Sequence, residues 1–127
     1  MNECVLDASA VLALVNGEPG MEAAERALPT AAISAVNLAE VTSKLAGAGV
    51  PADEIRLVLQ ALKLKVTDFD QVLAYRVGEL RRITREHGLS LGDRACLATA
   101  QALRVPVLTT DRVWSQLDIG VEIRVVR

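Results

Sequence analysis

Residues 5–13 read VLDASAVLA, in which one acid separates two apolar stretches. The apolar residues before Asp7 are typical of a short buried strand, and the residues after it are typical of a helix. Residues 105–114, VPVLTTDRVW, repeat this order, with Asp111 placed after the apolar run. Because the carboxyl ends of parallel strands lie along one edge of a sheet, where ligands bind, the two carboxylates are expected to share a site.

Strands and helices alternate along the whole chain. Short apolar runs predict strands at residues 4–6, 31–33, 64–67, 105–108 and 121–126. Helical spacing and capping residues predict helices near residues 8–15, 21–28, 35–47, 51–62, 70–87, 91–103 and 113–117. This alternation predicts an α/β fold, a three-layer α/β/α sandwich around a mainly parallel sheet.

Length and composition are typical of a small globular protein. A chain of 127 residues fits one domain, residues 1–127, and its 51% hydrophobic content excludes a disordered chain. Cys4 and Cys96 form no CxxC pair, so buried free thiols are expected and not a disulfide or a zinc site. No secretory signal and no apolar stretch of membrane-spanning length is visible, so we expect a cytoplasmic protein without a membrane partner.

The charge balance and the scarcity of aromatic residues narrow the function classes. A formal net charge of −2 argues against a general basic nucleic-acid binder. If four acidic side chains bound a metal, however, the 14 basic side chains would outnumber the remaining acids. A mildly basic surface around an acidic metal site is therefore compatible with the composition. The aromatic residues Phe69, Tyr75 and Trp114 are too few for an RNA reader that stacks bases on aromatic platforms.

Two further acids extend the candidate site. Glu40 lies in SAVNLAEV, residues 34–41, and Asp93 lies in LSLGDRACLATA, residues 89–100, both in helical patterns. A cluster of carboxylates without a basic partner is unfavourable unless a hard divalent cation binds between them. A magnesium site is therefore the leading hypothesis from the residues alone.

Each acid also has an ordinary structural explanation. Asp7 and Asp111 can cap the helices that follow them. Glu40 stands four residues before Lys44, the spacing of a helix-surface ion pair. Asp93 has capping-box spacing with a serine three residues earlier. Taken singly, these alternatives are as good as a metal site.

The joint pattern resembles the PIN domain, in particular the VapC-type toxin ribonucleases of bacterial toxin–antitoxin pairs. The stretches that carry the resemblance follow the family order and cover essentially the whole chain: VLDASAVLA, ISAVNLAEV, LSLGDRACLATA and VPVLTTDRVW. The resemblance implies a magnesium-dependent endoribonuclease, the toxin of a type II pair, that cleaves RNA phosphodiester bonds by metal-activated water. It also implies products with 5′-phosphate and 3′-hydroxyl ends.

The resemblance assigns roles to individual residues. The catalytic and metal-binding carboxylates would be Asp7, Glu40, Asp93 and Asp111, with Mg²⁺ as the cofactor and Mn²⁺ as the alternative. The first three would hold the main metal, and Asp111 would complete that site or help a second one. Ser9 and Thr109 occupy the family's small hydroxyl positions, where each would orient a carboxylate or a water. For Ser9, a hydrogen bond within the helix turn remains an equal alternative.

Other polar residues near the acids are less specific. Arg94 and Arg112 each follow one of these acids directly and would contact RNA phosphates, or else neutralise the acids or form surface pairs. Asn37 lies three residues before Glu40 and would support it, although a polar surface position is favoured. His87 is the only histidine, which excludes a two-histidine ribonuclease mechanism.

The resemblance further implies two protein partners besides the RNA substrate. One is a VapB-type antitoxin whose tail covers the acidic site, and the other is a second copy of the chain in a homodimer. The main alternative function is a non-catalytic PIN-like domain that binds RNA or protein without cutting it. A haloacid-dehalogenase-like phosphatase is disfavoured, because its second acid would stand where this chain has Ser9.

Overall fold

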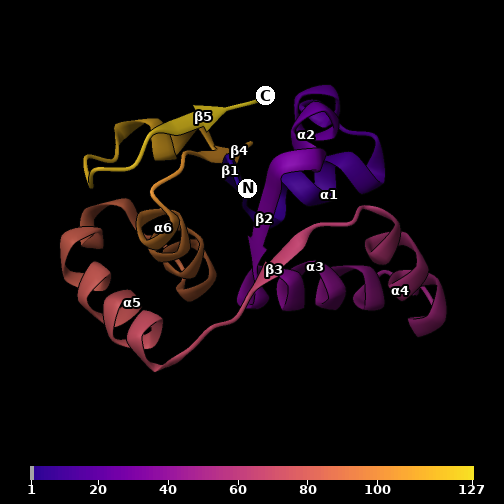
Figure 1. Cartoon of the computed structure of the whole chain (residues 1–127), viewed down its shortest axis with the longest axis horizontal. Coiled ribbons are helices and arrows are strands. Elements are labelled where there is room, and N and C mark those ends of the chain that lie inside the picture. The colour runs from indigo at the N-terminus through magenta and orange to yellow at the C-terminus, as the bar shows by residue number, and fades with distance from the viewer. Residues whose placement is uncertain (1) are drawn as a thin grey trace.

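Five parallel strands form the centre of the structure, a computed structural model that describes residues 2–127 (Figure 1). The strands are β1 (Cys4–Leu6), β2 (Ala31–Ser34), β3 (Lys65–Thr67), β4 (Val107–Thr109) and β5 (Ile123–Val125). Their order across the sheet is β3-β2-β1-β4-β5, and every neighbouring pair is parallel. The chain adds β2 and β3 on one side of β1, then β4 and β5 on the other. The boundary between β1 and β4 is therefore the topological switch point, where open α/β sheets bind ligands.

Helices cover both faces of the sheet. The α-helices are α1 (Ala8–Asn16), α2 (Met21–Ala27), α3 (Ala35–Gly47), α4 (Ala52–Ala61), α5 (Gln71–Ile83) and α6 (Leu91–Leu103). Short 3₁₀ helices are η1 (Leu28–Thr30), η2 (Arg85–His87) and η3 (Arg112–Gln116). Figure 1 shows α5 and α6 on one side of the strands and α1 to α4 on the other. Among residues 2–127, none of these helices has the length and apolar character needed to cross a lipid bilayer.

Alternating strand residues separate the core into two halves. Val5 of β1 packs with α5, α6 and the buried Trp114 of η3, whereas its neighbour Leu6 packs with α1, α3 and α4. Successive side chains of a strand point to opposite faces, so both faces of β1 are buried. This arrangement confirms the predicted three-layer α/β/α sandwich with a parallel sheet.

The predicted elements are present, with shifts at their ends. The predicted helix 70–87 ends at Ile83, because Thr84 leaves helical geometry and its hydroxyl donates to the Leu80 carbonyl at 2.7 Å. The 3₁₀ helix η2 continues the chain to Gly88, which has a left-handed φ of 62°. The predicted last strand, 121–126, is ordered as a strand only over Ile123–Val125.

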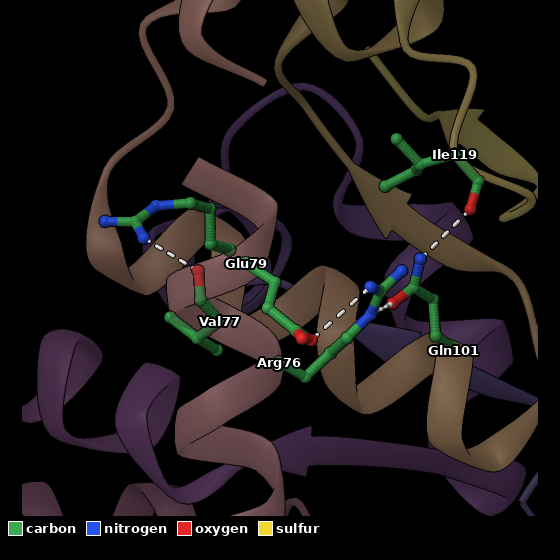
Figure 2. A network of polar contacts seen from close by, with 6 residues as sticks. Arg76, Val77, Glu79, Gln101 and Ile119 are labelled. Atoms are coloured by element: carbon green, nitrogen blue, oxygen red, sulfur yellow. Dashed lines mark hydrogen bonds and ion pairs between the residues drawn. The ribbon is translucent and has the colours of Figure 1, made fainter. Parts of the chain in front are cut away.

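A chain of polar contacts ties α5 to α6 and to the segment before β5 (Figure 2). Arg76 Nε donates to Gln101 Oε1 at 2.8 Å, and Gln101 Nε2 donates to the Ile119 carbonyl at 3.0 Å. The Arg76 guanidinium also lies 3.7 Å from the Glu79 carboxylate. These contacts hold α6 against its neighbours, and the first turn of α6 carries Asp93.

Candidate active site

Asp7 follows β1 directly, and its carboxylate is the centre of a hydrogen-bond network at the switch point. The residue is only 5% exposed. Its Oδ1 accepts from the Ser9 hydroxyl at 2.7 Å and from the Ala10 N–H at 2.9 Å, and its Oδ2 accepts from the Thr109 hydroxyl at 2.7 Å. The Ala10 contact makes Asp7 the N-cap of α1. Asp7 can therefore cap the helix, as predicted, and belong to the candidate site at the same time.

The two hydroxyls lock the loop after β4 onto this carboxylate. Each hydroxyl has one proton, and both protons are donated to Asp7. Their lone pairs are free to accept backbone N–H groups: Ser9 accepts from Thr110 and Thr109 accepts from Asp111, each at 3.0 Å. The hydroxyls therefore orient Asp7 and hold the loop that carries Asp111.

Burial leaves the negative charge of Asp7 poorly stabilised. Burial raises the pKa of this carboxyl above its ordinary value, and the nearby Asp93 charge raises it further, whereas the three hydrogen bonds lower it. No ion pair within residues 2–127 involves Asp7, Glu40, Asp93 or Asp111. A bound cation would therefore relieve an existing electrostatic cost at this place.

Glu40 of α3 and Asp93 of α6 act, together with Asp7, on the buried thiol of Cys96. Burial raises the pKa of this free thiol well above its ordinary value, and the charges of Asp7, Asp93 and Glu40 raise it further. The charges of all three carboxylates thus act on the same thiol of α6. The carboxylate of Glu40, from α3, lies directly against Gly92 in the first turn of α6. The prediction of buried free thiols is confirmed for both cysteines.

Asp93 and Asp111 also cap helices, as the structural alternatives predicted. Asp93 Oδ2 accepts from the Ser90 N–H at 3.0 Å in a complete capping box. Asp111 Oδ1 accepts from the Val113 N–H at 3.0 Å. Within residues 2–127, Asp111 is connected to Asp7 through its backbone N–H, which donates to the Thr109 hydroxyl, and through the bond from that hydroxyl to Asp7. Asp7, Glu40 and Asp93 are therefore linked electrostatically through Cys96, whereas Asp111 is linked to Asp7 through the loop after β4.

The donors present fit a hard divalent cation. All the candidate donors are carboxylate oxygens, which are ligands that Mg²⁺ and Mn²⁺ prefer, and the pKa of Asp7 is raised by burial and, to a smaller extent, by the Asp93 charge. As the side chains stand, no three His, Cys, Asp or Glu residues in 2–127 lie together in a way that could hold a metal ion. Mg²⁺ does not need such a group, because it keeps several waters and binds through one or two carboxylates.

The interpretation of Asn37 as a surface residue was wrong. Asn37 is 1% exposed, and its Nδ2 donates to Glu40 Oε1 at 2.7 Å and to the Gly92 carbonyl at 3.0 Å. Residues three apart on a helix share a face, so once Glu40 is placed in the site Asn37 must face inward as well. That spacing was the signal that could have identified it.

The proposed contact of Arg94 with RNA is also wrong. Arg94 is 6% exposed, and its guanidinium donates to the Val77 carbonyl of α5 at 2.8 Å. Consecutive helix residues project about 100° apart, so Arg94 points away from the side to which Asp93 points. Its place between α5 and α6 makes it a packing residue. Arg112 is exposed on η3, and its contact with RNA stays a prediction.

Replacing Arg94 with alanine should destabilise the fold. The substitution removes a charged donor from the Val77 carbonyl and a buried aliphatic stem, so we expect a loss of about 2–3 kcal/mol in the free energy of unfolding. Urea denaturation measures it. The exposed Arg112→Ala variant is the control and should stay within about 0.5 kcal/mol of the parent chain. An Arg94→Ala chain of unchanged stability but weaker RNA binding would contradict this assignment.

Comparisons with known proteins identify the family and the fold. A family model described as the PIN domain matches residues 4–120. A toxin–antitoxin complex from Klebsiella pneumoniae is 24% identical with a TM-score of 0.72, covering 95% of this chain and 100% of the other. DNA-bound VapBC from Salmonella typhimurium is 20% identical with a TM-score of 0.76, covering 98% of each chain.

A third similar structure is Mycobacterium tuberculosis VapC20, described as a sarcin–ricin loop cleaving toxin. It is 15% identical with a TM-score of 0.70, covering 94% of this chain and 99% of the other. At these identities the likeness to solved structures shows the fold alone. Comparison of the sequence with curated proteins gave no match.

Proposed function

The chain belongs to the PIN domain family, and from this premise we propose that it is a metal-dependent endoribonuclease, the VapC-type toxin of a type II toxin–antitoxin pair. The observation that carries the proposal is the buried carboxylate of Asp7 at the switch point, which has no ion pair within residues 2–127 and is influenced by the Asp93 charge. Phosphodiester hydrolysis requires an activated water and relief of negative charge, and an acidic oxygen-lined site serves both needs when a divalent cation binds.

The cation would be Mg²⁺, with Mn²⁺ as the alternative. When bound, it would supply charge relief at the scissile phosphate and lower the pKa of a water. Its ligands in this proposal are Asp7, Glu40 and Asp93, with Asp111 completing the site. The chain's own contribution is orientation, because both oxygens of Asp7 are held by the Ser9 and Thr109 hydroxyls.

Arg112 is proposed to contact the RNA backbone. It follows Asp111 at the start of η3 and is exposed, so its guanidinium is free to reach a phosphate. A planar guanidinium matches the geometry of phosphate oxygens. In this arrangement the carboxylates hold the cation and Arg112 helps position the substrate.

The descriptions of the similar structures support an RNA substrate and an antitoxin partner. One is described as a toxin that cleaves the sarcin–ricin loop, and two are complexes from toxin–antitoxin pairs. We infer that a VapB-type antitoxin inhibits this chain by placing a cationic side chain on the acids, since a guanidinium pairs well with carboxylates. The RNA and the antitoxin would meet the enzyme in the cytoplasm.

A homodimer is the proposed state of the free toxin. Helix α5 exposes three large hydrophobic side chains, Val72, Tyr75 and Ile83, which are available for self-association. Size-exclusion chromatography with light scattering should give the mass of two chains at micromolar concentration. A mass of one chain would remove the dimer from the proposal without affecting the nuclease.

Incubation of the purified chain with RNA in Mg²⁺ tests the proposed activity directly. We expect specific cuts whose downstream fragments carry 5′-phosphates, because water is the nucleophile and not the ribose 2′-hydroxyl. Sequencing after adaptor ligation that requires a 5′-phosphate detects these ends. Fragments with 5′-hydroxyl ends, or no cuts beyond those made by an Asp7→Asn chain, would contradict the proposal.

A further inference from the structure

Asn37 joins two helices at the candidate site. Its amide nitrogen donates to Glu40 on its own helix α3 at 2.7 Å and to the Gly92 carbonyl on α6 at 3.0 Å. Both acceptors lack a proton to donate, so the nitrogen of the amide has to face them. We propose that Asn37 and Gly92, here called the Asn37–Gly92 clasp, position the Glu40 carboxylate for the divalent cation. This inference rests on the proposed function.

The oxygen of the Asn37 side-chain amide differs from the nitrogen in its contacts. Its Oδ1 is buried and has no hydrogen-bond partner among residues 2–127. An unpaired buried acceptor is unfavourable, and an apolar side chain at this position would avoid that cost. The amide is therefore suited to the two donated hydrogen bonds and not to filling space in the core.

Gly92 forms the other part of the clasp. A Cβ added at residue 92 would overlap the Glu40 carboxylate, and even the more distant carboxylate oxygen would lie only 2.6 Å from it. Glycine is a poorer helix former than alanine, yet only glycine leaves room for the carboxylate here. The displaced group would be the end of a flexible side chain, so Gly92→Ala moves Glu40 without disturbing the backbone.

The clasp also determines where Glu40 lies relative to Asp93. Gly92 is the second residue of α6, and Asp93 follows it directly. The positive end of the helix dipole at this first turn favours a carboxylate beside it. By holding Glu40 at Gly92, the clasp places a carboxylate of α3 at the same turn of α6 that carries Asp93.

Calorimetric titration of the metal-free full chain with Mn²⁺ tests the inference. We expect Asn37→Ala and Gly92→Ala each to weaken Mn²⁺ binding about tenfold or more, the usual effect of losing a partner that orients a ligand. Gly92→Ala should keep or raise the melting temperature, because alanine favours the helix. Val41→Ala is the control: this buried residue of α3 contributes to the core, and its loss should lower the melting temperature and leave Mn²⁺ affinity unchanged.

A double-mutant cycle separates positioning from general stability. If Asn37 acts through Glu40, the Asn37→Ala/Glu40→Gln chain should bind Mn²⁺ no more weakly than Glu40→Gln alone. Additive losses, or parent-like affinity in both Asn37→Ala and Gly92→Ala, would overturn the clasp while the proposed function stands. A parent chain that binds no Mn²⁺ would overturn the proposed metal-dependent function and the clasp together.

Discussion

Replacing Asp7 with asparagine should lower the rate of RNA cleavage at least about a thousandfold, which corresponds to ~4 kcal/mol of transition-state stabilisation. Asp7 is the most buried of the four acids and follows β1 at the switch point between β1 and its neighbour β4. Asparagine keeps the shape of the side chain and removes the charge that would hold a cation. Single-turnover cleavage of one defined RNA measures the effect.

The same substitution should leave the fold intact and raise its stability near neutral pH in EDTA. Burial raises the pKa of Asp7 above its ordinary value of 3.8, so the folded chain binds this proton more tightly than the unfolded chain. Stability is therefore lost as the pH rises from the ordinary value through the raised one. Asparagine carries no such charge, so the gain over the parent chain should grow across this pH window.

Urea denaturation at both ends of this pH window measures that difference. Ser9→Ala is a useful control because it removes one hydrogen bond to Oδ1 but retains the carboxylate. It should not show the pH-dependent gain. A loss of stability in Asp7→Asn that is equal at both pH values would mean that its hydrogen bonds outweigh its charge.

Chelation should remove cleavage as completely as the Asp7 substitution does. In EDTA we expect no cleavage above background, and added Mg²⁺ or Mn²⁺ should restore it because both accept carboxylate oxygens. Ca²⁺ should bind the same oxygens without supporting the reaction. Cleavage that persists in EDTA would exclude the metal mechanism.

A thermal readout distinguishes the enzyme from a domain that only binds RNA. A cation that binds the folded chain raises its melting temperature by mass action, so Mg²⁺ should stabilise the parent chain and not Asp7→Asn. A non-catalytic PIN-like domain would bind RNA with or without the cation and would cut it in neither condition. That pair of results would favour the alternative function.

The helix caps and the sheet followed from short stretches of the chain. The cap at Asp7 depends on an N–H three residues later, and the capping box of Ser90 and Asp93 spans the same distance. The alternation of strands and helices then predicted a parallel sheet with Asp7 at a carboxyl end. These features depend on neighbours within one helical turn, which a sequence displays directly.

The two wrong interpretations concern contacts between distant segments. Asn37 reaches the carbonyl of Gly92, 55 residues later in the chain, and Arg94 reaches the carbonyl of Val77, 17 residues earlier. A polar residue in a helical pattern is read as exposed when its partner is on another helix. Both partners are backbone carbonyls. Every residue has such a carbonyl, so the type of residue in the sequence does not indicate these contacts.

The sequence by itself determined the fold class, the order of the elements and the strand-end position of Asp7. The packing of distant segments was needed to show that Asn37 donates to Glu40, that the charges of Asp7, Glu40 and Asp93 act on one thiol, and that Arg94 packs between helices. Local hydrogen bonds and hydrophobic periodicity depend on residues a few positions apart. The relative placement of the carboxylates depends on how α3 and α6 pack across the sheet, which is set by the whole core.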